Sequence, residues 1–401
     1  MIFANVNNIT IPEGSVERIT ETKTGRVLWK RGLPELKAHW EVIELTNNTA
    51  SNNYYNYMEY GVDTGDGIEL FNFANSKVTS HFKYKPSGVV SDVYALWRGA
   101  KLSDYDFQQY DENRNEDNYD FNVVGPIRGA AVDPISKIWV VSNGATYASN
   151  AFNPVKYKDE RLAKNRDSNV DMRTLYVCWA PELNRFCLVG APISGVGQSY
   201  LVDTSGSIRN SNTNIDTTEF YSNISIGYFH ITWSNKLGMF VVSDYNGLHI
   251  SRDGLNWEDR AINSVSNAPS DATLPSGPAF RAMAWVPTLD VFVIATYSSK
   301  KWYIYKSSDC YNWEYVTSLS TASSNVSEMY IDFCWSPDAQ ILLLSGAKTS
   351  YITRDLSEWV EITNSNGVTG GYRCLFWSKS FNSFFRTNRA NSTKLYKLVL
   401  G

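Results

Sequence analysis

The 401-residue sequence is poor in residues that bind metals or form disulfide bonds, with four His and five Cys. The His residues are far apart in the chain, at positions 39, 81, 230 and 249, and no two Cys have the C-x-x-C spacing of a zinc or redox motif. We therefore predict no metal site and no cofactor. An odd number of free thiols is typical of a protein made in a reducing cytoplasm.

Long apolar runs and an excess of basic residues are also absent. No apolar run reaches the roughly 18 residues that a membrane-spanning helix needs. The start "MIFANVNNIT" lacks the basic and apolar regions of a signal peptide. The formal net charge of −4 argues against a nucleic-acid partner, because such proteins carry a basic face. We expect no membrane insertion and no bound nucleic acid.

Aromatic residues, in contrast, are abundant, with 13 Trp, 25 Tyr and 18 Phe, and aromatic and β-branched residues favour strands. A pattern of an anchor residue, a polar turn and an apolar run repeats along the chain, as in "HITWSNKLGMFVV" and "AMAWVPTLDVFVI". The anchors of the repeats are Tyr84, Val132, Trp179, Trp233, Trp285, Trp335 and Trp377, which are 42 to 54 residues apart. Repeats of this length with several short strands each indicate a β-propeller.

We therefore predict an all-β fold, a seven-bladed β-propeller of four-stranded antiparallel blades over residues 34–401. The last repeat lacks a fourth strand, because the sequence ends with "KLYKLVLG", which has the pattern of a third strand. Residues 40–45 resemble the fourth strands "WEDR" and "WEYV" of other repeats. We expect them to complete the C-terminal blade and so close the ring, since an open ring leaves unpaired sheet edges. The alternative is a separate strand at 40–45 and a short last blade.

A second motif lies between the third and fourth strands of three repeats. Its copies have the spacing S/T-x-D-x-x-x-W: "SRDGLNW" (Ser251, Asp253, Gly254, Trp257), "SSDCYNW" (Ser307, Asp309, Trp313) and "TRDLSEW" (Thr353, Asp355, Trp359). The motif resembles the Asp-box of sialidase-like propellers, which implies a structural hairpin at the periphery of a blade. Asp fixes such a turn by accepting hydrogen bonds from nearby backbone N–H groups, and Gly254 adopts a positive φ at little cost. We assign these residues a structural role.

Candidate binding residues precede the anchors. Arg128, Arg281 and Arg373 stand four residues before their anchors, and Tyr228, Tyr330 and Tyr372 stand five before theirs. First strands line the channel of a propeller, so we expect these side chains at the channel mouth. There the arginines either clamp a carboxylate or phosphate or pair with acids of the loops.

The same mouth faces the long segments that link successive blades, which we place at 46–80, 111–127, 158–173, 209–226, 261–279 and 317–329. They are rich in Asn, Ser, Asp, Thr and Tyr, and long loops on a rigid scaffold often bind ligands. Tyr and Asn together suit a protein or a glycan. We expect this face to bind a partner protein or a glycan of the host surface.

The Asp-box resemblance also raises an enzymatic alternative. A sialidase-like glycan hydrolase has three arginines, and such enzymes need a Tyr nucleophile with a Glu partner and an Asp acid. Tyr330, Tyr372 and Asp332 stand near the right positions, but no motif fixes them. We assign no catalytic residue and treat hydrolysis as the alternative to binding.

Residues 1–33 do not fit the repeat. They resemble the N-terminal segments of tailed-bacteriophage virion proteins in "I-P-E-G-x-V-x-x-I", from Ile11 to Ile19, followed by a hairpin and "G-x-x-L-W", from Gly25 to Trp29. The resemblance implies docking to other virion proteins of a tail, baseplate, neck or fibre region, so we expect a virion structural or host-attachment protein made in the host cytoplasm. The alternatives are a flexible N-terminal arm and a bacterial interaction propeller with no viral connection.

Overall fold

The computed structural model describes part of the chain in detail. The described residues are 18–20, 27–30, 36–44, 58–63, 65, 67–74, 78–84, 90–95, 129–135, 139–142, 146–149, 154–157, 172–192, 197–203, 215–220, 230–243, 247–272, 280–298, 300–321, 331–346, 348–363, 372–388 and 394–400. Their regular secondary structure is all β-strand, with no helix among them. Consequently no helix in this part of the chain is long and apolar enough to cross a membrane.

The strands form antiparallel four-stranded sheets in which consecutive strands lie side by side. The first sheet contains β4 (Met58–Asp63), β5 (Ile68–Ala74), β6 (Val78–Tyr84) and β7 (Val90–Ala95). The second contains β8 (Gly129–Val132), β9 (Trp139–Ser142), β10 (Thr146–Ser149) and β11 (Pro154–Tyr157). The third contains β12 (Met172–Ala180), β13 (Arg185–Pro192), β14 (Gly197–Asp203) and β15 (Ile215–Phe220). The fourth contains β16 (His230–Ser234), β17 (Met239–Ser243), β18 (Leu248–Ser251) and β19 (Glu258–Arg260).

The next two sheets keep this order, and one of them gains a strand. The fifth contains β21 (Phe280–Val286), β22 (Val291–Ser298), β23 (Lys301–Ser307) and β24 (Asn312–Ser320), with β20 (Ser264–Ser266) added outside β24. Strand β20 runs parallel to β24, so that Val265 lies opposite Trp313. The sixth contains β25 (Asp332–Ser336), β26 (Ile341–Ser345), β27 (Thr349–Thr353) and β28 (Val360–Thr363).

The last sheet joins segments from distant parts of the sequence. It contains β29 (Tyr372–Ser378), β30 (Ser383–Asn388) and β31 (Lys394–Leu400), and its outer strand is β3 (Ala38–Glu44). Strand β3 is antiparallel to β31, with Trp40 opposite Leu398. The strand predicted at 40–45 therefore lies in the C-terminal sheet.

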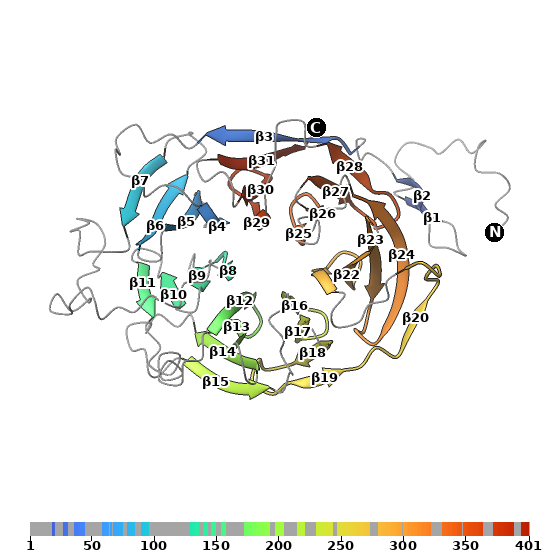
Figure 1. Ribbon diagram of the computed structural model, residues 1–401, viewed down its shortest axis with the longest axis horizontal. Coiled ribbons are helices and arrows are strands. Elements are labelled where there is room, and N and C mark those ends of the chain that lie inside the picture. The colour runs from blue at the N-terminus through green and yellow to red at the C-terminus, as the bar shows by residue number, and fades with distance from the viewer. Residues whose placement is uncertain are drawn as a thin grey trace.

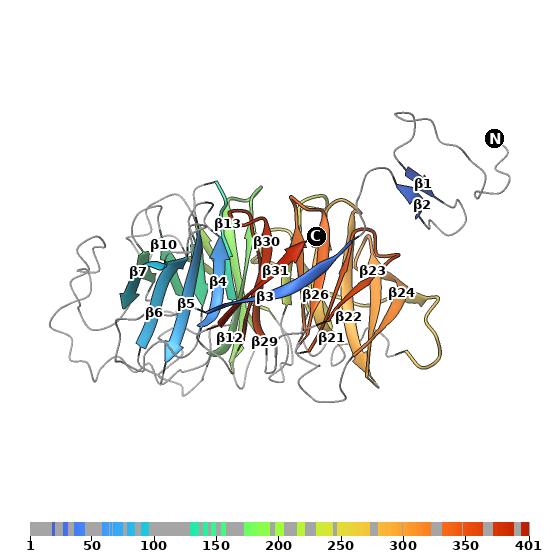
Figure 2. The same cartoon turned by 90° about the horizontal axis from the view of Figure 1, so that it is seen from above.

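The sheets are arranged around a central space, as in a propeller. Figure 1 shows the first strand of each sheet innermost and the last outermost, and Figure 2 shows the resulting disc from its side. The innermost strands of successive sheets contact one another around this space, and β29 also contacts β4. Successive sheets are thus packed against one another along their inner strands.

This packing explains why the inner strands are apolar on both faces. In β21, the small residues Ala282 and Ala284 belong to a buried cluster shared with the β25–β28 sheet. The large residues Met283 and Trp285 belong to a cluster shared with the β16–β19 sheet. All seven residues of β21 are buried. The small residues of β21 therefore face one neighbouring sheet, and the large residues face the other.

The Trp anchors of the repeat connect neighbouring sheets. Trp233 lies opposite Phe240 across the first hairpin, with ring centroids 4.6 Å apart. Its indole Nε1 donates to Glu182 Oε2 of the preceding sheet at 2.6 Å. The indoles of Trp285 and Trp377 likewise donate to the preceding turns, at Asn235 Oδ1 (3.0 Å) and Asp338 Oδ2 (2.9 Å). The anchor therefore packs within its own sheet and bonds to the neighbour.

The anchor predicted at Tyr84 is wrong. Tyr84 ends β6, the third strand of its sheet, whereas the first strand is β4. Every other anchor lies opposite the residue seven positions later, as Val132 does with Trp139, and in the first sheet it is Val62 that lies opposite Glu69. The first repeat therefore has Val62 at the anchor position, and its neighbour Gly61 packs closely, since an added Cβ there would come 2.6 Å from Phe376.

The predicted bounds of several linking segments are also wrong. Residues 46–80 contain β4 and β5, and residues 209–226 contain β15. The segment 261–279 includes the short strand β20, and 317–329 begins inside β24. Residues 111–127 lie outside the described part of the chain. The sequence therefore misplaced the ends of these linking segments.

The N-terminal segment forms a small sheet of its own. Strands β1 (Arg18–Thr20) and β2 (Val27–Lys30) are antiparallel, with Ile19 opposite Trp29. Figures 1 and 2 show this pair beside the disc rather than within it. The segment that follows it enters the disc as β3.

Candidate functional site

Four polar side chains on consecutive inner strands form what we call the inner-wall cluster. They are Tyr176 of β12, His230 of β16, Arg281 of β21 and Asp332 of β25. His230 Nδ1 is 3.8 Å from Asp332 Oδ1, although the strand of Arg281 lies between their sheets. The rings of Tyr176 and His230 are 6.0 Å apart. The cluster therefore spans four sheets.

The backbone of β21 places Arg281 in this cluster. The pairing of β21 with β22 is irregular between Phe280 and Ala282, which lets an extra residue into the strand. Arg281 is only 9% exposed, and its Nη1 donates to Phe280 O at 3.0 Å. A buried guanidinium is thus held on the inner wall, where it can bind an anionic or carbonyl group of a ligand.

Burial lowers the pKa of His230 to about 4, and the positive charge of Arg281 acts in the same direction, whereas a hydrogen bond with the Arg281 backbone opposes it. His230 is therefore neutral at pH 7. A neutral imidazole beside a carboxylate can both donate and accept hydrogen bonds. The cluster offers a ligand one cation, one anion, a phenol and an imidazole.

Acidification is expected to destabilise the protein through His230. In the unfolded chain His binds its proton near its ordinary pKa of 6.5, whereas in the folded protein it does so at about 4. The unfolded state therefore binds more protons between these values. The contribution of His230 to the free energy of unfolding is therefore fully present above about pH 6.5. It falls as the pH drops towards 4, by up to about 3 kcal/mol.

Urea unfolding of the wild type and of His230→Gln at a series of pH values in this range tests the prediction. Between pH 6.5 and 4, the free energy of unfolding should change much less with pH in the variant than in the wild type. The pH dependence that carboxylates contribute should be the same in both proteins. Equal slopes in the two proteins would contradict the assignment to His230.

The structure tests only part of the predicted channel mouth. Arg281 lies in the inner-wall cluster, and Tyr372 and Arg373 lie in β29, where only their backbone is described. Arg128, Tyr228 and Tyr330 are outside the described residues. The convergence of three arginines, and with it the sialidase-like alternative, stays a prediction.

His230 was missed by reasoning from the sequence, which treated the His residues only as separate metal ligands. Its position carried a signal, because Tyr176, His230 and Asp332 all stand three residues before their Trp anchors. Repetition of polar residues at one position of a buried strand indicates a shared site. Among the described residues, no group of three or more His, Cys, Asp or Glu is arranged to hold a metal ion.

The three S/T-x-D-x-x-x-W turns share one hydrogen-bond pattern. In the first, Asp253 Oδ1 accepts from the backbone N–H groups of Leu255 (2.8 Å) and Asn256 (2.7 Å), while Ser251 Oγ accepts from Gly254 N (2.8 Å). The turns at Asp309 and Asp355 repeat these bonds. Partial burial acts to raise the pKa of Asp253, but the hydrogen bonds, chiefly from Asn256, outweigh it and lower the pKa to about 2. Its carboxylate is thus committed to the turn.

The residue after each of these Asp has a positive φ: +78° at Gly254, 59° at Cys310 and 66° at Leu356. Cys310 and Leu356 are buried in clusters shared with the preceding sheet. At Gly254 the equivalent space is filled by Leu201 of the preceding sheet, whose Cδ2 would lie 2.6 Å from an added Cβ. The space between the two sheets is therefore filled either by the side chain of this turn residue or, at Gly254, by a side chain of the preceding sheet.

The free cysteines are poor nucleophiles. All five described thiols are unpaired. Burial raises the pKa of Cys178 and of Cys374 to about 12, so both remain protonated at neutral pH. Their arrangement suits packing rather than covalent chemistry.

Comparison with known proteins identifies no family. No family model and no curated protein matches the chain. Among solved structures, the chain is similar to one described as "Structure of Dos1 propeller", with a TM-score of 0.45 and 9% sequence identity over 84% of this chain and 76% of that chain.

Proposed function

We propose that the chain is a closed seven-bladed β-propeller and serves as a structural or host-attachment component of a tailed-bacteriophage particle. In this proposal residues 1–33 dock to other virion proteins, and the disc binds a partner protein or host glycan. The observation that carries it is the separation of the β1–β2 sheet from the disc, while the following strand β3 is built into the last sheet. A docking element joined directly to a rigid scaffold is what attachment to a particle needs.

Closure of the ring is supported by contacts between the first and last sheets. Asp63, at the end of β4, accepts hydrogen bonds from Ser378 Oγ and from Ser380 N, the latter at 2.7 Å. Cys374 and Phe376 of β29 lie against Gly61. These contacts join the two sheets as other neighbours are joined.

The proposed ligand face is the end at which the inner strands begin. The segments that link one sheet to the next end at this face, and the inner-wall cluster lies near it. A buried cation and a partly exposed carboxylate near one another can discriminate between polar ligands. We therefore place recognition of a partner or glycan at this face.

Removal of residues 2–33 is the test of the docking role. We expect the shortened chain to keep the thermal midpoint of the full chain within about 2 °C, because the β1–β2 sheet is too small to add to the core. When tagged chains are expressed in cells producing the particle, the full chain should sediment with particles and the shortened chain should not. A shortened chain that still sediments with particles, or one that unfolds, would refute the docking role.

A further inference from the structure

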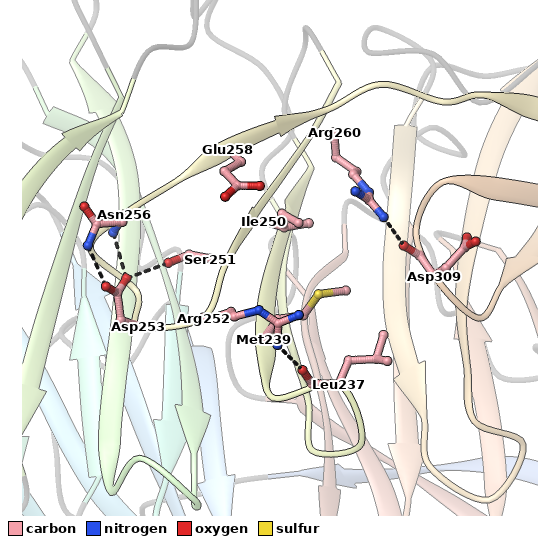
Figure 3. A pocket seen from close by; sticks show the side chains of 10 residues that line it. All are labelled: Leu237, Met239, Ile250, Ser251, Arg252, Asp253, Asn256, Glu258, Arg260 and Asp309. Atoms are coloured by element: carbon pink, nitrogen blue, oxygen red, sulfur yellow. Dashed lines mark hydrogen bonds between the residues drawn. The ribbon is translucent and has the colours of Figure 1, made fainter.

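A groove between two sheets lies at the other end of the strands from the inner-wall cluster. It has a volume of about 370 Å³ and runs from the turn after β18 to the turn after β23. Leu237, Met239 and Ile250 give it an apolar floor, and Arg252, Glu258 and Arg260 line it with charge. Figure 3 shows Asp253 and Asn256 at one end, Arg260 and Asp309 at the other, and Arg252 between them. This volume is within the range of small-molecule sites.

Both arginines of the groove are held in place by backbone carbonyls. Arg252 Nη1 donates to Leu237 O at 2.9 Å, and Arg260 Nη2 donates to Asp309 O at 3.2 Å (Figure 3). The guanidinium of Arg260 also lies 4.9 Å from the centre of the Tyr311 ring. The side chains are therefore ordered before any ligand binds, which reduces the entropic cost of binding.

The charges of these arginines are not cancelled within the groove. A carbonyl carries no formal charge, and in the described part of the chain no carboxylate oxygen lies within 4.0 Å of either guanidinium. Glu258 stands two residues before Arg260 on β19, so both side chains lie on the same face of the strand and line the groove. These two side chains form no ion pair with each other. A ligand carboxylate can accept two parallel hydrogen bonds from a guanidinium with free N–H groups.

The rest of the groove argues against a simple anion as its ligand. Asp253 stays ionised, with a pKa of about 2, and Glu258 adds an exposed carboxylate. Both carboxylates repel a small anion such as phosphate, and Glu258 can accept hydrogen bonds from hydroxyl groups. The apolar floor suits the C–H face of a sugar ring. A ligand with one carboxylate, several hydroxyls and an apolar face satisfies all three parts.

We propose that this groove binds a carboxylated sugar, such as a uronic acid residue of an acidic polysaccharide. The carboxylate lies against Arg252 and Arg260, the hydroxyls face Glu258 and Asn256, and the ring covers Met239 and Ile250. The inference does not depend on a viral role or on residues 1–33, because every group belongs to the groove. It adds a second recognition site at the opposite end of the strands from the inner-wall cluster.

Titration calorimetry of the full chain with D-galacturonate, D-galactose, acetate and inorganic phosphate tests the ligand class. D-galactose lacks the carboxylate and acetate lacks the hydroxyls, so each should bind at least tenfold more weakly than D-galacturonate. Phosphate binding equal to that of D-galacturonate would indicate a plain anion site and overturn the proposal. Absence of D-galacturonate binding, both as the free sugar and as polygalacturonate, would also overturn it.

Variants locate the site. Arg252→Ala should weaken D-galacturonate binding at least tenfold without affecting folding, because Arg252 is exposed. Arg260→Lys should also weaken it, since the charge remains but the paired donors are lost. Lys301→Ala, which removes an exposed positive charge outside the groove, is the matched control and should bind as the wild type does. Unchanged binding in both arginine variants would exclude this groove.

Discussion

Replacing Trp40 with alanine is expected to lower the free energy of unfolding by about 3–5 kcal/mol, the usual cost of truncating a buried Trp. Trp40 is 1% exposed and packs with Phe384, Tyr396 and Leu398 of the last sheet. The same cluster includes Leu343 of the neighbouring sheet, so the cavity would open between two sheets.

A buried guanidinium adds to this cost. Arg386 is fully buried, lies 5.2 Å from the Trp40 ring, and donates to Gly346 O at 3.0 Å. Without the indole, this guanidinium loses a cation–π contact inside the protein. Urea unfolding measures the effect, and Glu41→Ala, at the exposed next position of β3, is the control with an expected change within about 0.5 kcal/mol. Equal stability of the two variants would show that β3 contributes little to the core.

Replacing Gly254 with alanine is expected to destabilise the protein by about 2–5 kcal/mol. The backbone there has a φ of +78°, which costs an L-residue about 1–2 kcal/mol. The new methyl group would also meet Leu201 Cδ2 at 2.6 Å and Phe240 Cε2 at 3.2 Å, and overpacking of this kind adds about 1–3 kcal/mol.

Gly238 provides a control that separates these two contributions. It has a φ of +58°, and an added Cβ would meet nothing within 4 Å. Gly238→Ala should therefore show the backbone cost alone, about 1–2 kcal/mol. Thermal or urea unfolding of both variants gives the difference. If Gly254→Ala is no worse than Gly238→Ala, Leu201 moves aside and the contact between the sheets is looser than the structure indicates.

Much of the architecture was predictable because the Trp anchors play the same structural role in most of the sheets. Trp179, Trp233, Trp285 and Trp377 all pair with a Phe seven residues later, so sequence, turn and packing repeat together. The first sheet was misread because Val62 stands where most of the other repeats have Trp. Strand β20 could not be foreseen, since three residues that pair in parallel with a distant strand leave no periodic pattern.

The inner-wall cluster was only half predictable. Arg281 was found from its place before an anchor, but its entry into the cluster depends on a strand irregularity that spacing does not reveal. His230 and Asp332 meet across an intervening sheet, and such a contact follows from the arrangement of the sheets around the central space rather than from any local sequence. The groove between the β16–β19 sheet and the β21–β24 sheet was not predicted either, because Arg260 and Asp309, which line it, come from different sheets.

The pairing of β3 with β31 sets an order on biosynthesis. Residues 38–44 leave the ribosome long before residues 394–400, and until then β3 has no partner strand. Its apolar side chains, Trp40 among them, must stay exposed or be shielded while every other sheet forms. Pairing over so long a separation is slow, and unpaired strands invite association between chains. Aggregation during translation, rather than instability of the finished disc, is therefore the hazard that this design carries.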